Sequence, residues 1–217
     1  MGKALGWIDS HCHLTCADLI GEVQDVRQRA LDAGVARMMI VCCRLEEAEA
    51  ALKMKAEDAR FDVAVGFHPS DLRDFTEEDW HKLETLVYNE NVTAIGEIGL
   101  DYYWDKDNHP QQQAAFIRQI ELANRVNKPI LVHSRDAIGD TLDLLREHPA
   151  ARRGIIHCFS SSREMAREFV KLGYTIGLGG PVTFKNAKTP KEVAMDVDLA
   201  HLQIETDCPY LTPVPYR

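Results

Sequence analysis

The chain has 217 residues, of which 45% are hydrophobic, and a formal net charge of −9 at pH 7. This is enough chain for a sizeable core, and the acidic balance argues against a broad surface that coats nucleic acid. Because no apolar run approaches the roughly 20 residues that cross a bilayer and the first residues do not resemble a signal peptide, we expect a cytoplasmic protein without a membrane partner.

Short apolar or β-branched runs alternate with segments of helical spacing along the chain. The candidate strands are residues 6–9, 37–43, 62–68, 93–99, 129–134, 154–159, 174–179 and 202–207. The candidate helices are 18–34, 46–59, 76–88, 110–126, 137–148, 161–173 and 189–196, and Thr76 is the predicted N-cap of the third. This alternation predicts an α/β fold, a single (β/α)₈ TIM barrel over residues 1–217, with a doubly wound sheet as the alternative.

Polar residues recur at or near the C-terminal ends of six of these strands. They are His11, His13, His68, Glu97, His133, His157 and Asp207. The C-terminal strand ends of a barrel surround one pocket, whereas those of a doubly wound sheet lie along an edge, so the barrel would bring these residues together. Two-residue spacing places Asp9, His11 and His13 on one strand face, and it does the same for Glu205 with Asp207 and for His133 with Arg135.

Imidazoles and carboxylates in this number indicate a metal centre. One catalytic metal usually takes three protein ligands, and this set exceeds that number, so we expect two divalent ions. His11, His13 and Asp207 would hold one, His133 and His157 the other, and Glu97 would bridge them. Imidazole and carboxylate donors suit zinc, manganese and similar ions, whereas a site for magnesium alone would have only oxygen donors. The candidate metals are therefore Zn, Mn, Co and Ni, with Mg, bound by the carboxylates, as a further candidate.

Such a pair of metals would activate a bridging water, and Asp207 could accept its proton. A lone strand histidine is more often a core residue than a ligand. The prediction therefore depends on the whole set, whose two carboxylates would otherwise be buried unpaired at a large energetic cost.

Two cations are candidates for binding phosphate. Arg135 points into the predicted pocket by its position in the strand, and it could equally form an ion pair with a neighbouring carboxylate. Lys185 follows the glycine-rich stretch at 177–184, where barrels often bind phosphate. An exposed loop lysine is the more common case.

Seven motifs extend this interpretation over essentially the whole chain. They are "IDSHCHL", "GFHP", "GEIGLDYY", "ILVHSRDA", "IIHCFSSS", "GPVTFKNA" and "IETDCPYL", in this order. The sequence closely resembles the TatD-type metal-dependent hydrolases of the amidohydrolase-like superfamily. The resemblance implies a TIM-barrel deoxyribonuclease, with 3′–5′ exonuclease behaviour, whose substrate is DNA.

The resemblance also implies roles for individual residues. It supports His11, His13, Glu97, His133, His157 and Asp207 as metal ligands. It places His68 near the substrate, in a phosphate-contact or acid role, and Glu205 in support of the ligands. Two departures are that Ser161 stands where family members often have glycine, and that members usually continue some forty residues further. We therefore expect no eighth outer helix here and open apolar faces on the first and last strands.

Three functions are weighed from these observations. The first is a two-metal phosphodiesterase acting on single-stranded DNA or 3′ ends, with a monomer favoured. The second is a hydrolase of another ester or amide bond, such as an aminoacyl ester on tRNA, which the same chemistry would serve. The third is a non-catalytic scaffold that retains a metal site, which should be coordinately closed.

Overall fold

The computed structural model describes residues 6–217. Its parallel strands are β1 (Trp7–Cys12), β2 (Val35–Cys42), β3 (Phe61–Val65), β4 (Val92–Asp101), β5 (Ile130–Arg135), β6 (Gly154–Ile156), β7 (Thr175–Leu178) and β8 (Leu202–Ile204). Each strand pairs with the next one along the chain, in the order β1 to β8. This order forms a nearly closed barrel, and the doubly wound alternative is wrong because it would place some sequential strands apart in the sheet.

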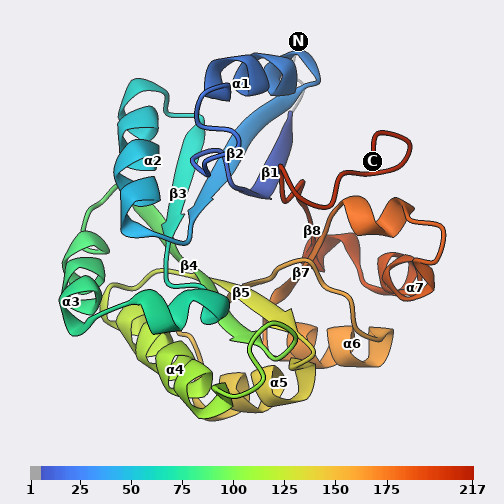
Figure 1. The fold of residues 1–217 in the computed structure, drawn as a ribbon. Helices are drawn as coiled ribbons and strands as arrows, with labels where there is room; N and C mark the ends of the chain where they lie inside the picture. The colour runs from blue at the N-terminus through green and yellow to red at the C-terminus, as the bar shows by residue number, and fades with distance from the viewer. Residues whose placement is uncertain (1–5) are drawn as a thin grey trace.

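The helices surround the barrel (Figure 1). They are α1 (Val23–Asp32), α2 (Leu45–Glu57), α3 (Glu77–Leu86), α4 (His109–Arg125), α5 (Ile138–Glu147), α6 (Arg163–Lys171) and α7 (Lys188–Asp196), with 3₁₀ helices η1 (Pro69–Asp74), η2 (Gly180–Thr183) and η3 (Leu199–His201). Thr76 caps α3 as predicted, because its side chain and that of Asp79 each accept from the other's backbone N–H.

The core has two parts that lie on opposite faces of the strands. The larger cluster includes Ile98, Phe116 and Phe169 and packs between the strands and the helices. The smaller cluster consists of Val41, Ala64, Ala94 and Leu131, which alternate along their strands with members of the larger cluster. The alternation places this smaller cluster inside the barrel, where it supports the site above it.

β3, β6 and β8 each end three residues earlier than predicted, so His68, His157 and Asp207 follow their strands rather than lying within them. Pro69 begins η1 directly after His68 and has no backbone N–H for a sheet ladder. Cys158, directly after His157, has φ +44°, and Asp207 has φ +59°. This left-handed backbone cannot continue a strand.

No ladder pairs β1 with β8 within residues 6–217, and side chains of β1 form hydrogen bonds to β8 and to the segment after it. The carboxylate of Asp9 accepts hydrogen bonds from the backbone N–H of Thr206 at 2.9 Å and from its hydroxyl at 2.6 Å. Ser10 donates to the carbonyl of Ile204 at 3.0 Å. The prediction that Asp9 shares the pocket face of His11 and His13 is wrong. A register shift between Asp9 and Cys12 turns Asp9 toward this seam instead.

The outer side of this seam is apolar and open. Trp7, Ile8 and Ile204 are 65%, 53% and 49% exposed. Within the described residues, 205–217 form turns and irregular structure after β8. Among the helices of residues 6–217, none combines the length and apolar character needed to span a membrane.

Candidate metal centre

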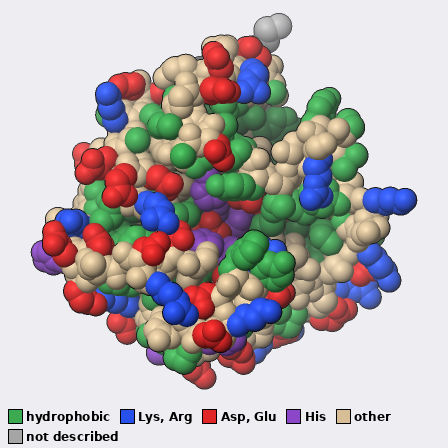
Figure 2. Space-filling model, viewed as in Figure 1, with side chains coloured by type: hydrophobic (Ala, Val, Ile, Leu, Met, Phe, Trp, Pro, Cys, Tyr) green, Lys and Arg blue, Asp and Glu red, His purple; other side chains and the backbone are tan. Residues whose placement is uncertain are grey.

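A cavity of about 810 Å³ opens at the C-terminal ends of the strands. Figure 2 shows histidine side chains gathered in this hollow at the centre of the visible face. The lining includes His13, His68, Glu97, His133, His157 and Asp207, so residues predicted from six strands do converge. His11 is buried beside them, with its ring stacked on that of His157 at a centroid distance of 3.5 Å.

Glu97 lies at the centre of this group, and its two oxygens face different histidines. Oε2 is 3.4 Å from Nε2 of His11 and 3.8 Å from Nε2 of His13. Oε1 is 2.8 Å from Nδ1 of His133 and 3.6 Å from Nε2 of His157. One buried carboxylate thus lies between two sets of imidazole nitrogens.

Asp207 completes the first set. Its Oδ1 lies 3.3 Å from Nε2 of His13, 3.8 Å from Nε2 of His11 and 3.6 Å from Nε2 of His157. The backbone N–H of Asp207 donates to the carbonyl of His11 at 2.9 Å, which fixes the loop after β8 against β1. The Nε2 atoms of His11 and His13 are 3.1 Å apart. Together with Oε2 of Glu97 and Oδ1 of Asp207, they make four donor atoms that lie close to one another.

The outward-facing nitrogens of three histidines lie beside oxygen atoms, through hydrogen bonds at His13 and His133 and at ion-pair distance at His157. Nδ1 of His13 lies 3.1 Å from the carbonyl of Val41. Nε2 of His133 lies 2.9 Å from Oδ2 of Asp101, and Nδ1 of His157 lies 3.1 Å from Oε1 of Glu205. Acceptors of this kind fix the tautomer and the ring orientation of metal-binding histidines. Glu205 is therefore a direct neighbour of His157, one of the predicted ligands.

Asp101 is a residue of the site that the sequence analysis missed. It belongs to the quoted motif "GEIGLDYY", but the strand was predicted to stop at residue 99, whereas β4 extends to Asp101. A two-residue period from Glu97 would have placed Asp101 on the same face. Gly99 allows the backbone of β4 to lie close to that of β5 at His133, because a Cβ at residue 99 would lie 2.0 Å from the carbonyl oxygen of His133.

Burial and mutual charge shift the pKa values of the buried groups. Burial raises the pKa of Glu97, but His157 and His11 outweigh it and hold that pKa well below its usual range. Burial lowers the pKa of His157, but the carboxylates of Glu205 and Glu97 outweigh it and raise the pKa to about 10. The hydrogen bonds of His133 to Asp101 and Glu97 likewise raise its pKa against the effect of burial. The centre thus holds opposite charges that a metal ion would rearrange.

His68 differs from the other histidines of the cavity. Its Nδ1 accepts from the backbone N–H of Ser70 at 3.2 Å, so the ring proton resides on Nε2. Burial and the neighbouring His133 lower its pKa to about 3. A neutral ring with an Nε2–H is a hydrogen-bond donor, which fits the predicted phosphate contact better than the acid role.

The two predicted phosphate-binding cations differ in position. Arg135 lines the cavity, and among residues 6–217 no carboxylate lies within 4.0 Å of its guanidinium, so its ion-pair alternative is not supported. Lys185 is exposed after η2 and lies outside the cavity lining. The structure therefore brings only the first of the two to the site.

The donor set fits a divalent metal ion. Nitrogen and carboxylate oxygen atoms lie within 4.8 Å of one another in several groups of the described residues, among them His11, His13 and Glu97; His11, His157 and Asp207; and His68, Glu97 and His133. Nδ1 of His11 is buried without a hydrogen-bond partner. Neutral imidazole and carboxylate are donors that zinc and manganese accept.

The barrel and this centre define a metal-dependent hydrolase of the TIM-barrel type. The family model described as TatD related DNase matches residues 8–217. The chain is 44% identical over 210 residues to the uncharacterized metal-dependent hydrolase YabD of Bacillus subtilis, covering 96% of this chain and 82% of YabD. It is 38% identical over 214 residues to YcfH of Escherichia coli, covering 97% and 80%.

A solved structure agrees with these relatives. The crystal structure of YjjV, a TatD homologue from Escherichia coli, has a TM-score of 0.91 and 32% identity, covering 95% of this chain and 81% of that one. The chain therefore belongs to the TatD-related DNase family, as the motifs of the sequence indicated, and it spans about four fifths of the length of these relatives.

Proposed function

We propose that the protein is a metal-dependent deoxyribonuclease that hydrolyses phosphodiester bonds of DNA. The observation that carries this proposal is the position of Glu97, whose Oε2 faces His11 and His13 while Oε1 faces His133 and His157. A carboxylate between two sets of imidazoles suits a bridge between two metal ions, the arrangement used in many phosphodiester hydrolases.

Each residue then has a part in the reaction. From the distances of the two Glu97 oxygens and of Asp207, His11, His13 and Asp207 would hold one ion, His133 and His157 the other, and Glu97 both. Bound ions would polarise a phosphoryl oxygen and acidify a water. Asp207 would accept the proton of that water, while Arg135 and Nε2–H of His68 would contact the phosphate.

Finer points of the function stay predictions. These are the number and identity of the metals, 3′–5′ polarity, preference for single-stranded ends, the monomeric state and the cytoplasmic location. The named relatives are described only as metal-dependent hydrolases.

Hydrolysis of another ester or amide bond is the second candidate. The net charge of −9 favours it, because an acidic surface repels long nucleic acids. A scaffold with a structural metal is disfavoured, since the candidate ligands line an open cavity rather than a closed site.

The test compares the wild type with Glu97→Ala on single-stranded DNA and on ester substrates, with manganese, zinc or cobalt added. We expect metal-dependent cleavage of DNA by the wild type and at least a 100-fold loss in the variant, about the effect of losing one central electrostatic group. Glu164→Gln changes an exposed carboxylate on α6, and it should leave the activity unchanged. Undiminished turnover in Glu97→Ala would falsify the proposal, and ester turnover without DNA cleavage would favour the second candidate.

A further inference from the structure

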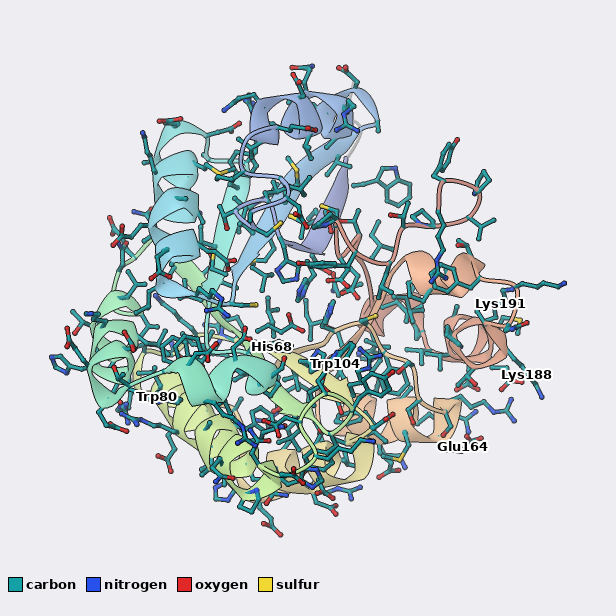
Figure 3. The ribbon with its side chains drawn as sticks, viewed as in Figure 1. His68, Trp80, Trp104, Glu164, Lys188 and Lys191 are labelled. Carbon is teal, nitrogen blue, oxygen red and sulfur yellow. The ribbon has the colours of Figure 1, made fainter. Side chains whose placement is uncertain are left out.

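Trp104 is an exposed aromatic residue at the wall of the cavity. It follows β4, lines the same cavity as Glu97 and His133, and is 66% exposed. Figure 3 shows Trp104 and His68 near the centre of the face, whereas Trp80 lies on α3 at its edge. A tryptophan in a monomeric protein is usually well buried, so an exposed indole beside candidate catalytic groups indicates a surface for a ligand.

The backbone on both sides of Trp104 is held firmly. Oδ1 of Asp101 accepts hydrogen bonds from the N–H groups of Tyr103 and Trp104, both at 3.0 Å. On the other side, Asp105 forms a two-point ion pair with Arg73, at 2.7 and 2.9 Å. The backbone of the loop is therefore fixed before any ligand arrives, which lowers the entropy lost on binding.

Gln112 on α4 also holds the backbone of this loop through hydrogen bonds. It is fully buried, accepts from the N–H of Asp101 at 2.7 Å and donates to the carbonyls of Asp101 at 2.8 Å and Asp105 at 3.3 Å. Three hydrogen bonds from one buried side chain bracket the segment that carries Trp104. The fold thus fixes the backbone and leaves the indole in solvent.

Arg135 places a cation beside this ring. Its guanidinium carbon lies 4.0 Å from the ring centroid of Tyr103 and 5.3 Å from that of Trp104. Stacking fixes the plane of the guanidinium and leaves its N–H donors free for a planar or tetrahedral anion. Within the described residues it has no carboxylate partner, although the protein carries a net charge of −9.

A ligand that matches both groups has a flat ring close to an anion, as a nucleotide does. Resting on the proposed function, we propose that Trp104 is the stacking site for a nucleobase of a single-stranded DNA substrate. Arg135 contacts the phosphate next to that nucleoside, and this phosphate lies between Arg135 and the candidate metal ligands. A simple aliphatic ester has no ring for this surface, so Trp104 makes the site selective for nucleotides.

The experiment measures kcat/KM for wild type, Trp104→Ala and Trp104→Phe on matched oligonucleotides. One substrate carries ordinary bases, and the others replace a single nucleoside near the 3′ end by an abasic tetrahydrofuran unit. We expect Trp104→Ala to lose about 5–100-fold on the ordinary substrate, the range expected for one stacked base. One of the abasic substrates lacks the base that stacks on Trp104. On that substrate, kcat/KM of Trp104→Ala should be less than about 2-fold below that of the wild type. Trp104→Phe should retain most of the activity.

Controls separate this inference from the proposed function. Tyr88→Ala removes another exposed aromatic side chain, 67% exposed and outside the cavity, and should change neither substrate. An equal loss by Trp104→Ala on all substrates would mean a structural role and overturn the inference, while the deoxyribonuclease proposal would stand. If the wild type cleaves none of the oligonucleotides with any of the metals, both fail.

Discussion

Oε1 of Glu205 lies 3.1 Å from Nδ1 of His157 and also accepts the N–H of Cys158 at 2.7 Å. The contact with His157 is buried and the one with Cys158 is partly buried, and the two join the segment after β8 to the residues that follow β6. The carboxylate therefore orients the imidazole and increases its basicity, as partners of metal-bound histidines do.

Replacing this carboxylate should weaken the metal centre without disrupting the fold. Glu205→Gln keeps an oxygen for the N–H of Cys158 but removes the charge that faces His157. We expect metal affinity or activity to fall about 10–100-fold, measured by metal titration and turnover. Gly177→Ala tests the same contact, because a Cβ there would lie 2.4 Å from Oε2 of Glu205. Wild-type affinity in both variants would contradict the role assigned to Glu205.

Metal binding should release protons. The pKa of His157 is raised to about 10, and Asp207 raises that of His13 above its ordinary value although burial opposes it. The ring of His157 therefore holds a proton at pH 7, and a metal binds the neutral form. Affinity should therefore increase from pH 6 to pH 9, and calorimetry in two buffers of different ionisation enthalpy should show net proton release. His148→Gln, at the end of α5, should not change the release, and a value of zero in the wild type would refute the charge pattern described above.

Gln119 should matter for stability because it is a buried partner of the backbone before His68. Its side chain accepts from the N–H of Phe67 at 2.8 Å and donates to the carbonyl of Phe67 at 3.1 Å. Gln119→Leu leaves both groups buried and unpaired, so unfolding in urea should show a loss of about 1–3 kcal/mol. Gln111→Leu, on the exposed side of the same helix, should stay within about 0.5 kcal/mol of wild type. Equal stability of the two variants would count against the role of Gln119.

Asp58 should contribute stability that depends on pH. Hydrogen bonds from Arg60, with Arg27 nearby, hold the pKa of Asp58 below its usual value. A lowered pKa in the folded state means that the contribution is complete above the ordinary value of roughly 3.9 and is lost as pH falls below it. Asp58→Asn should therefore cost about 1 kcal/mol at pH 7, and the difference from wild type should shrink below pH 4. A constant difference down to pH 2 would contradict this explanation.

The alternation of strands and helices, and the polar residues at strand ends, could be predicted from the sequence because they follow hydrophobic periodicity and barrel geometry. The ends of β3, β6 and β8 could not, since they depend on Pro69 and on left-handed backbone at two other positions. Local patterns also gave no signal for Gln112 or Gln119, because each side chain bonds to backbone outside its own helix, which for Gln119 is 52 residues away in sequence. The orientation of Asp9 required the register shift in β1.

The seam between β1 and β8 has a consequence for protein synthesis. Asp9 and Thr206, which close it, are 197 positions apart, and their neighbours His11 and Asp207 share the candidate metal centre. A ribosome that adds roughly 5–20 residues per second needs about 10–40 s to pass from one to the other. An ion held by both can be captured only after translation has produced the second, so metal loading would report on the completion of the barrel in a nascent chain.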